Sequence, residues 1–278
     1  MKVIQSIAET IEACRAAARP LGLVPTMGYL HEGHATLARR ASQECATVAA
    51  SIFVNPTQFG PSEDFASYPR SMERDLAMLE AAGTDIVFAP TLAEMYPPGF
   101  DTWVEVGALT QRLEGAVRPG HFRGVCTVVA KLFTITRPDR AYFGRKDGQQ
   151  LAVIRKMAAD LNLGVQIVPV ETVRESDGLA MSSRNVYLTP EQRRAAPVIY
   201  RALSHVRELY QKGERNAERL RLEGRRIIEA EPLVVSVDYF SIADAATLEE
   251  LDIVDRPALV STTARIGRAR LIDNVMLG

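Results

Sequence analysis

The sequence predicts an α/β protein, with a doubly wound parallel sheet followed by a smaller C-terminal α+β domain. Up to about residue 170, short apolar runs that end in proline or glycine alternate with longer segments of helical period. This alternation is typical of a parallel sheet covered by helices on both faces. From about Thr189 the chain changes to helices of mixed charge and then to strand-like runs. We therefore expect two domains, at 1–175 and 176–278.

The expected elements of the first domain alternate in type along the chain. The first twenty residues carry an amphipathic helical pattern. Short apolar runs bounded by turn residues then predict strands at 22–25, 47–54, 86–89, 141–143 and 165–170. Apolar residues at helical spacing predict helices at 34–45, 71–82, 123–136 and 148–161. Since open parallel sheets bind ligands at the carboxyl ends of their strands, the polar residues that follow these strands are the candidate site residues.

The second domain is expected to begin with helices and to end with strands. Thr189 and Pro190 are typical of a helix start, with an N-cap threonine and proline at the first helical position. The stretch after residue 201 interleaves glutamate with arginine and is broken by Gly213 and Gly224, which indicates helices with solvated faces. Strand-like runs follow at 234–242 and 264–275.

The composition excludes several classes of protein. With 278 residues, 47% hydrophobic and 24% charged, the chain can bury a core and is not disordered. A formal net charge of −1 gives no overall electrostatic footprint for nucleic acid or an anionic membrane. The three cysteines form no CxxC pair, and the most apolar stretch, 46–54, is far shorter than the ~20 residues of a membrane span. We expect a cytoplasmic protein with neither a nucleic-acid nor a membrane partner.

A segment rich in glycine and histidine follows the first of these strands. It reads PTMGYLHEGH at 25–34 and comes directly before a helix. Glycine lets a ligand approach the backbone, a helix N-terminus favours anions, and imidazoles can donate hydrogen bonds to phosphate oxygens. A zinc-protease helix needs histidines four residues apart, one more than the spacing here. By itself the segment leaves an ordinary turn, a phosphate site and a metal site open.

Three other segments carry groups suited to anionic or hydroxylated ligands. Asn55 and Gln58 follow the second strand, and an amide offers both a donor and an acceptor to a hydroxy acid. Lys146 comes soon after the strand at 141–143, where a cation can neutralise charge on a phosphate. The tripeptide SSR at 182–184 combines hydroxyls with a guanidinium fork. Taken singly, each is more typical of an ordinary loop.

Together these segments resemble one known family. PTMGYLHEGH resembles the HIGH-type motif of the nucleotidylyl-transferase superfamily. More closely, the chain resembles the pantothenate synthetase (pantoate–β-alanine ligase) family. The likeness covers nearly all of residues 20–195 and is carried, besides PTMGYLHEGH, by SIFVNPTQFGPSEDFASYPR, LEGAVRPGHFRGVCTVVAKLF, GRKDGQQLAVIRKM and DGLAMSSRNVYLTPEQR. It implies a Rossmann-like first domain that binds ATP and pantoate, and a C-terminal lid domain.

The resemblance also implies roles for individual residues. It assigns catalysis to His34, His31 and Lys146. Pantoate would bind at Asn55, Gln58 and Gln150, and His121 would either orient a loop or touch substrate. ATP would contact Met27, Gly28, His31, His34, Gly144, Lys146, Asp147, Val173, Met181, Ser182, Ser183 and Arg184. Mg²⁺ should bridge the triphosphate, with Asp75 as its candidate protein ligand.

The implied reaction is the ATP-dependent condensation of (R)-pantoate with β-alanine to pantothenate, through pantoyl adenylate, with release of AMP and pyrophosphate. A homodimer is implied as well. Two positions depart from the family pattern, since Arg145 stands for an acid and Gly148 for an aromatic residue. Two other interpretations therefore compete with the ligase: a nucleotidylyltransferase that moves AMP onto a phosphate acceptor, and an inactive ATP-binding regulatory protein.

Overall fold

A computed structural model describes residues 1–61 and 63–278, which group into two compact units. Unit 1 comprises Met1–Thr110, Arg118–Gly144 and Val153–Val170. Unit 2 comprises Gln111–Val117, Arg145–Ala152 and Glu171–Gly278. The chain therefore enters unit 2 through two short segments before its C-terminal part joins them. The expected domains, 1–175 and 176–278, stay a prediction.

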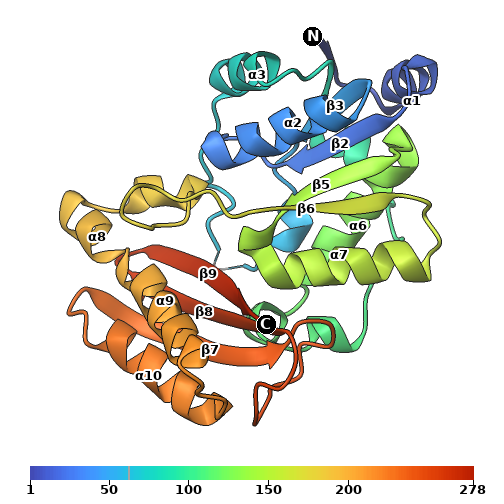
Figure 1. The fold of residues 1–278 in the computed structure, drawn as a ribbon. Coiled ribbons are helices and arrows are strands. Elements are labelled where there is room, and N and C mark those ends of the chain that lie inside the picture. The colour runs from blue at the N-terminus through green and yellow to red at the C-terminus, as the bar shows by residue number, and fades with distance from the viewer. Residues whose placement is uncertain (62) are drawn as a thin grey trace. The chain divides into compact units, whose positions relative to one another are not determined.

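Unit 1 is built on a six-stranded parallel sheet of order β1-β4-β3-β2-β5-β6, with helices flanking it (Figure 1). The five expected strands are confirmed. A sixth, β1, was not predicted, because it has three residues and only Ile4 of them is buried. The strands are β1 Lys2–Ile4, β2 Leu21–Thr26, β3 Thr47–Ile52, β4 Ile86–Phe88, β5 Arg140–Gly144 and β6 Gln166–Val170.

The helices of unit 1 confirm the four segments expected from apolar spacing. They are α1 Ile7–Ala16, α2 Glu32–Glu44, η1 Pro56–Gln58, α3 Met72–Ala81, α4 Leu92–Met95, η2 Ala108–Thr110, α6 His121–Thr136 and α7 Gly148–Asp160. The first turn of α7 belongs to unit 2. Helix α6 packs closely on η1, because a Cβ at Gly124 would lie 2.4 Å from the carbonyl oxygen of Thr57. None of the helices in the described part of the chain has the length and apolar composition needed to cross a membrane.

The order of the strands places a topological switch point between β2 and β5. From β2 the chain continues to β3 and β4 on one side, whereas β5 and β6 lie on the other side. The hydrogen-bonded register of β2 with β5 joins Gly22 to Arg140 and Leu23 to Ala141, near the amino ends of both strands. Open α/β sheets bind ligands beyond the carboxyl ends of the strands at such a point. The loops after β2 and β5 are therefore the first places to look for a site.

Unit 2 contains an antiparallel sheet of three strands, β7 Val234–Asp244, β8 Ala258–Ile266 and β9 Ala269–Leu277. The expected single strand at 264–275 is wrong, because this run crosses a hairpin turn at Gly267 and Arg268. Gly267 has φ +57°, a conformation that favours glycine and closes the hairpin. The helices of unit 2 are α5 Glu114–Val117, η3 Arg145–Asp147, η4 Ser183–Tyr187, α8 Pro190–Ala195, α9 Val198–Gln211 and α10 Ala217–Glu229.

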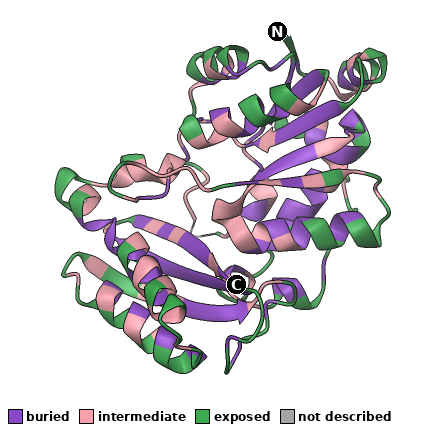
Figure 2. Ribbon diagram, viewed as in Figure 1, coloured by how far each residue is buried: buried purple, intermediate pink, exposed green. Residues whose placement is uncertain are grey.

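Strands β8 and β9 and the second half of β7 are largely buried, whereas α9 and α10 keep exposed faces (Figure 2). The predicted start of α8 is confirmed, since Thr189 and Gln192 form a reciprocal capping box. Helix α10 lies close to β7 because Gly224 has no side chain: a Cβ there would meet the ring of Phe240 at 2.2 Å. The charged residues after 201 thus lie on helices with one apolar face, as predicted.

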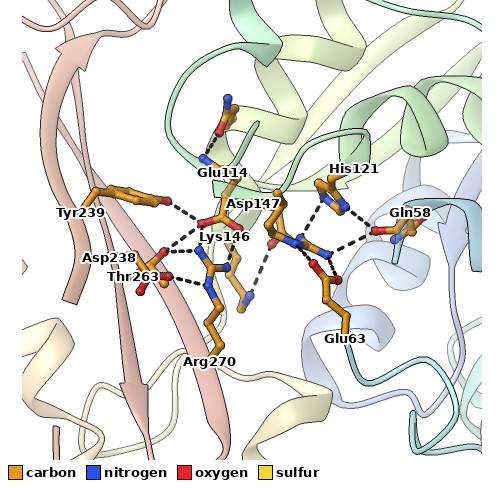
Figure 3. Close-up of polar contacts among 12 residues, drawn as sticks. Gln58, Glu63, Glu114, His121, Lys146, Asp147, Asp238, Tyr239, Thr263 and Arg270 are labelled. Carbon is orange, nitrogen blue, oxygen red and sulfur yellow. Dashed lines mark hydrogen bonds and ion pairs between the residues drawn. The ribbon is translucent and has the colours of Figure 1, made fainter. Parts of the chain in front are cut away.

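A buried ion pair ties the short segment Gln111–Val117 to the sheet of unit 2 (Figure 3). Arg270 on β9 donates two hydrogen bonds to the carboxylate of Glu114, at 2.7 and 2.9 Å. The hydroxyls of Tyr239 and Thr263 each donate to the same carboxylate at 2.9 Å. Burial alone would raise the pKa of Glu114, but Arg270 and these hydroxyls more than offset it and lower the pKa from 4.5 to about 2.

This depressed pKa predicts a pH-dependent contribution to stability. The contribution of Glu114 should be complete above pH 4.5 and lost as the pH falls from 4.5 to about 2, a loss of about 3 kcal/mol. The check is the melting temperature of the wild type and of Glu114→Gln at pH 7, 4.5 and 3. The difference in melting temperature between the two proteins should become smaller below pH 4.5. A difference that stays constant would contradict the lowered pKa of Glu114.

Candidate active site

The loop after β2 is shaped by one buried carboxylate. Asp75, in the first turn of α3, accepts hydrogen bonds from the backbone N–H groups of Tyr29 and Leu30, both at 2.7 Å. Gly28 has φ +86°, and a Cβ there would lie 3.1 Å from Asp75 Oδ2. Asp75 therefore determines the course of the chain from β2 into α2. From the sequence, Asp75 was expected only as a metal ligand, and its hydrogen bonds to Tyr29 and Leu30 were not predicted.

The two histidines form a reciprocal cap on the N-terminus of α2. His31 Nδ1 accepts from the N–H of Gly33 at 3.1 Å, and His34 Nδ1 accepts from the N–H of His31 at 3.3 Å. Their ring centroids are 4.1 Å apart. Because each Nδ1 accepts, each neutral ring carries its proton on Nε2. A Cβ at Gly33 would lie 2.8 Å from the ring of His31, so glycine is required here.

The two amides after β3 have different tasks. Asn55 is 1% exposed, and its Nδ2 donates to Gln58 Oε1 and to the carbonyl of Gly124, both at 3.1 Å. Its Oδ1 accepts from the hydroxyl of Tyr96 at 2.9 Å. Gln58, also buried, donates from Nε2 to Met27 Sδ at 3.2 Å, which connects it to the loop after β2. Asn55 thus holds Gln58 in place.

A series of polar contacts holds the backbone of Gln58 in place (Figure 3). His121 Nδ1 donates to the backbone carbonyl of Gln58 at 2.8 Å. Arg118 Nη1 then lies 3.1 Å from His121 Nε2, and the Arg118 guanidinium pairs with both carboxylate oxygens of Glu63, at 2.7 and 2.6 Å. These contacts give His121 the loop-orienting role, one of the two alternatives left open by the sequence.

Lys146 follows Gly144 at the end of β5 and lies in η3, within unit 2. Its Nζ is 3.4 Å from Asp147 Oδ1, and its side chain is 19% exposed. The backbone carbonyls of Arg145 and Lys146 accept hydrogen bonds from Asn274 Nδ2, at 2.9 and 2.7 Å. Strand β9 therefore holds the backbone that carries this lysine.

Gln149 and Gln150, adjacent at the start of α7, also have different roles. Gln149 is buried, donates to the carbonyl of Arg112 at 2.7 Å and accepts from the N–H of Glu114 at 2.9 Å. The fold thus uses Gln149 to hold the segment Gln111–Val117. Gln150, the predicted pantoate ligand, is only half-buried.

The loop from Val173 to Arg184 is held within unit 2. The carbonyl of Val173 accepts from the N–H of Met181 at 3.0 Å, and the hydroxyl of Ser182 caps η4 through the N–H of Arg184 at 3.3 Å. Ser183 and Arg184 lie in the first turn of η4. Ser182, Ser183 and Arg184 therefore lie together at the start of η4, and Met181 before them is bonded to Val173.

The two departures from the family pattern have local explanations. Arg145 Nε lies 2.8 Å from the carboxylate of Glu171, which offsets part of its charge. A Cβ at Gly148 would lie 3.1 Å from Leu259 Cδ1 and 3.3 Å from Asn274 Nδ2. Leu259 and Asn274 thus occupy the space around position 148, so a larger residue there would require Leu259 to move.

Sequence prediction grouped all these residues into one site, and each unit brings part of them together. Unit 1 contains Met27, Gly28, His31, His34, Asn55, Gln58, Asp75 and Gly144. Unit 2 contains Lys146, Asp147, Gln150, Val173, Met181, Ser182, Ser183 and Arg184. Within residues 1–61 and 63–278, no group of three or more His, Cys, Asp or Glu side chains could hold a metal ion. The assigned ligand roles stay predictions.

Comparison with known proteins identifies the family. The family model for pantoate-beta-alanine ligase matches residues 1–276. The chain belongs to this family. A pantothenate synthetase of Roseiflexus sp. (strain RS-1) is 60% identical over 277 residues, which cover 100% of this chain and 99% of the relative. Another, from Chloroflexus aurantiacus (strain ATCC 29366 / DSM 635 / J-10-fl), is 59% identical over 278 residues and covers 100% of this chain and 98% of that relative.

Solved structures agree with this membership. The crystal structure of pantothenate synthetase from Thermus thermophilus superimposes with a TM-score of 0.94 at 50% identity, covering 99% of both chains. Pantoate-beta-alanine ligase from Francisella tularensis, complexed with beta-gamma ATP and beta-alanine, has a TM-score of 0.81 at 32% identity, covering 99% of this chain and 97% of that one. These comparisons confirm the resemblance and the fold class, and they favour a ligase over the two competing interpretations.

The contacts of Asp75 predict a structural effect of Asp75→Asn in this ligase. The variant keeps one acceptor oxygen but replaces the other by an NH2 group, so the N–H of Tyr29 or that of Leu30 loses its acceptor. It should therefore lose about 2 kcal/mol of stability and most of its activity. Its half-saturating Mg²⁺ concentration should stay that of the wild type. Glu73→Gln, in the same helical turn, is the control and should be neutral. A raised Mg²⁺ requirement in Asp75→Asn would instead assign Asp75 to the metal.

Proposed function

We propose that this chain condenses (R)-pantoate with β-alanine in two steps at the expense of ATP. In the first step, a pantoate carboxylate oxygen attacks the α-phosphorus of ATP, and the bond to the β-phosphate oxygen breaks, releasing pyrophosphate. In the second, the amine of β-alanine attacks the acyl carbon of pantoyl adenylate, expels AMP and loses a proton. The products are pantothenate, AMP and pyrophosphate.

The observation that carries the proposal is the histidine cap at the N-terminus of α2. It lies at the switch point of the sheet, and both rings direct their Nδ1 atoms to the backbone. This arrangement leaves Nε2–H as the donor on each ring and places it at a helix N-terminus, where negative charge is favoured. His31 and His34 are therefore suited to stabilise charge that grows on phosphate oxygens in the transition state.

The acid site is proposed at Gln58, with Gln150 as its second amide. Gln58 is buried, positioned by Asn55 and by His121, and it contacts Met27 in the loop of the histidines. A positioned amide can donate to a carboxylate and accept from a hydroxyl, which are the groups that pantoate presents. Asn55 supports this site through Gln58, since its own amide bonds to protein groups.

The nucleotide phosphates are proposed to meet Lys146 and the turn at 182–184. Lys146 and Arg184 would neutralise phosphate charge, and Ser182 and Ser183 would add hydroxyl donors. Mg²⁺ would accompany ATP as part of the substrate, because this ion keeps waters and binds mainly through phosphate oxygens. The complex of the Francisella tularensis ligase with beta-gamma ATP and beta-alanine supports both substrates.

Pantoate-dependent exchange of labelled pyrophosphate into ATP tests the first step alone. We expect exchange that needs ATP, Mg²⁺ and pantoate but not β-alanine, and pantothenate only after β-alanine is added. Exchange without pantoate, or none at all from folded protein, would contradict the proposal. The proposed homodimer rests on the family resemblance, and light scattering of the purified protein would check it. The proposed cytoplasmic location rests on the composition and the cysteine pattern of the sequence.

Variants at position 34 distinguish two roles of the His34 ring: capping the helix through Nδ1 and donating a hydrogen bond to phosphate through Nε2. His34→Asn keeps an acceptor near the position of Nδ1 but has no group at Nε2, whereas His34→Gln places an amide N–H near Nε2. His34→Asn and His34→Ala should lose exchange by ~10²-fold or more, the usual cost of a transition-state donor. His34→Gln should keep more activity than either. Near-normal exchange in folded His34→Ala would refute the role.

Replacement of Gln58 or Gln150 should weaken the binding of pantoate far more than the binding of ATP. Gln58→Ala and Gln150→Ala each leave a hydroxyl or carboxylate of pantoate without its partner, so pantoate affinity should fall at least about tenfold. Calorimetric titration with each ligand measures both affinities. Gln149→Ala is a matched comparison on the same helix and should act mainly on stability. Equal losses for ATP and pantoate in Gln58→Ala would count against the assignment.

A further inference from the structure

We infer that Asp273 and Asn274, adjacent on β9, are positioning residues. They hold in fixed positions relative to each other the two segments of unit 2 that are proposed to bind the phosphates of ATP. One segment is Arg145–Asp147, which carries Lys146, and the other runs from Val173 to Arg184. Strand β9 is near the C-terminus and belongs to none of the motifs that point to ATP. The inference rests on the proposed function, because it assigns these segments to the phosphates of ATP.

Asn274 acts on the first segment. It is 8% exposed, and its Nδ2 donates to two successive carbonyls, Arg145 at 2.9 Å and Lys146 at 2.7 Å. Two bonds from one amide fix the direction of both carbonyls. Because the side chain of Lys146 leaves from the backbone that these bonds fix, its range of positions is set by β9.

Asp273 acts on the second segment through Arg174. Its carboxylate pairs with Arg174 Nη1 at 2.5 Å and Nη2 at 2.9 Å, a bidentate geometry that fixes the guanidinium plane. The same guanidinium donates to the carbonyl of Gly178 at 3.1 Å and lies 3.9 Å from the ring of Tyr200. Arg174 is next to Val173 and bridges to Ala180, so the loop that leads to Ser182 is held at both ends.

The two residues are also connected to each other. The N–H of Asn274 donates to Asp273 Oδ1 at 2.8 Å, and the carbonyl of Asn274 accepts from Arg174 Nη2 at 3.3 Å. One dipeptide therefore contacts both segments through part-buried hydrogen bonds. A displacement of either residue would move Lys146 relative to the turn at 182–184, and preorganised charges lose their effect when their spacing changes.

The test is Asn274→Leu, which keeps the branched shape but has no donor. Exchange of pyrophosphate into ATP should show a kcat/KM for ATP reduced about tenfold or more, with the KM for pantoate within about twofold of wild type. Ser261→Ala is the control, because Ser261 pairs in register with Asn274 and its hydroxyl has no hydrogen-bond partner among the described residues. It should behave as wild type.

A double-mutant cycle distinguishes positioning from general loss of structure. ATP affinity is measured by calorimetry for Asn274→Leu, Lys146→Ala and the double variant. If Asn274 acts through Lys146, the double variant should bind ATP as weakly as Lys146→Ala alone, whereas independent effects would add. Additive losses, or equal losses for ATP and pantoate in Asn274→Leu, would overturn the inference. Should Asn274→Leu fail to fold, Asn274→Asp replaces it, since an isosteric carboxylate also lacks the donors.

The outcomes also separate this inference from the proposed function. Wild-type protein without pantoate-dependent exchange would refute the proposed function, and the calorimetric cycle with ATP would still decide the role of Asn274. Wild-type exchange together with an Asn274→Leu variant of unchanged ATP dependence would refute the inference alone. Asp273→Asn provides an independent arm, with the same selective loss toward ATP expected because a neutral amide cannot hold Arg174 in bidentate geometry.

Discussion

The carboxylate of Asp75 is the constraint on which the turn from β2 into α2 depends. A tight turn from strand to helix leaves backbone N–H groups without helical partners, and burial makes such groups costly. Asp75 accepts from two of them, at Tyr29 and Leu30. The turn can then place His31 at the N-cap of α2, where its ring accepts from the N–H of Gly33. The orientation of both imidazoles follows from this arrangement.

Much of the fold was predictable from the sequence, whereas the site at the strand ends stays a prediction. Alternating apolar runs and helical periods identify five of the six strands and the flanking helices, because burial on a parallel sheet requires these patterns. The short edge strand Lys2–Ile4 escapes this reasoning, since one buried residue gives no pattern. The hairpin at Gly267 was missed because apolar residues occur on both sides of it and the turn has only two residues.

The tasks of individual polar residues were less predictable, because they depend on tertiary contacts. Asn55 and Gln58 are equivalent amides in sequence, yet Asn55 bonds to Gly124 and Tyr96, which lie far along the chain. Gln149 and Gln150 differ in the same way. In each pair one amide is bonded mainly to groups far along the chain, and the other is the one proposed to bind a ligand. Long-range hydrogen bonds decide which is which, and a single sequence does not contain them.

Each unit consists of several separate segments of the chain, and this affects the order in which the contacts of unit 2 can form during translation. The segments Gln111–Val117 and Arg145–Ala152 belong to unit 2, but their partners on β9 come much later in the chain: Arg270 is 156 residues after Glu114, and Asn274 is 129 residues after Arg145. During translation, Glu114 and the backbone around Lys146 leave the ribosome long before those partners. A nascent chain that ends before β9 contains all six strands of the parallel sheet but lacks these contacts to Glu114 and to the backbone around Lys146. Synthesis of β9 therefore supplies these contacts of unit 2.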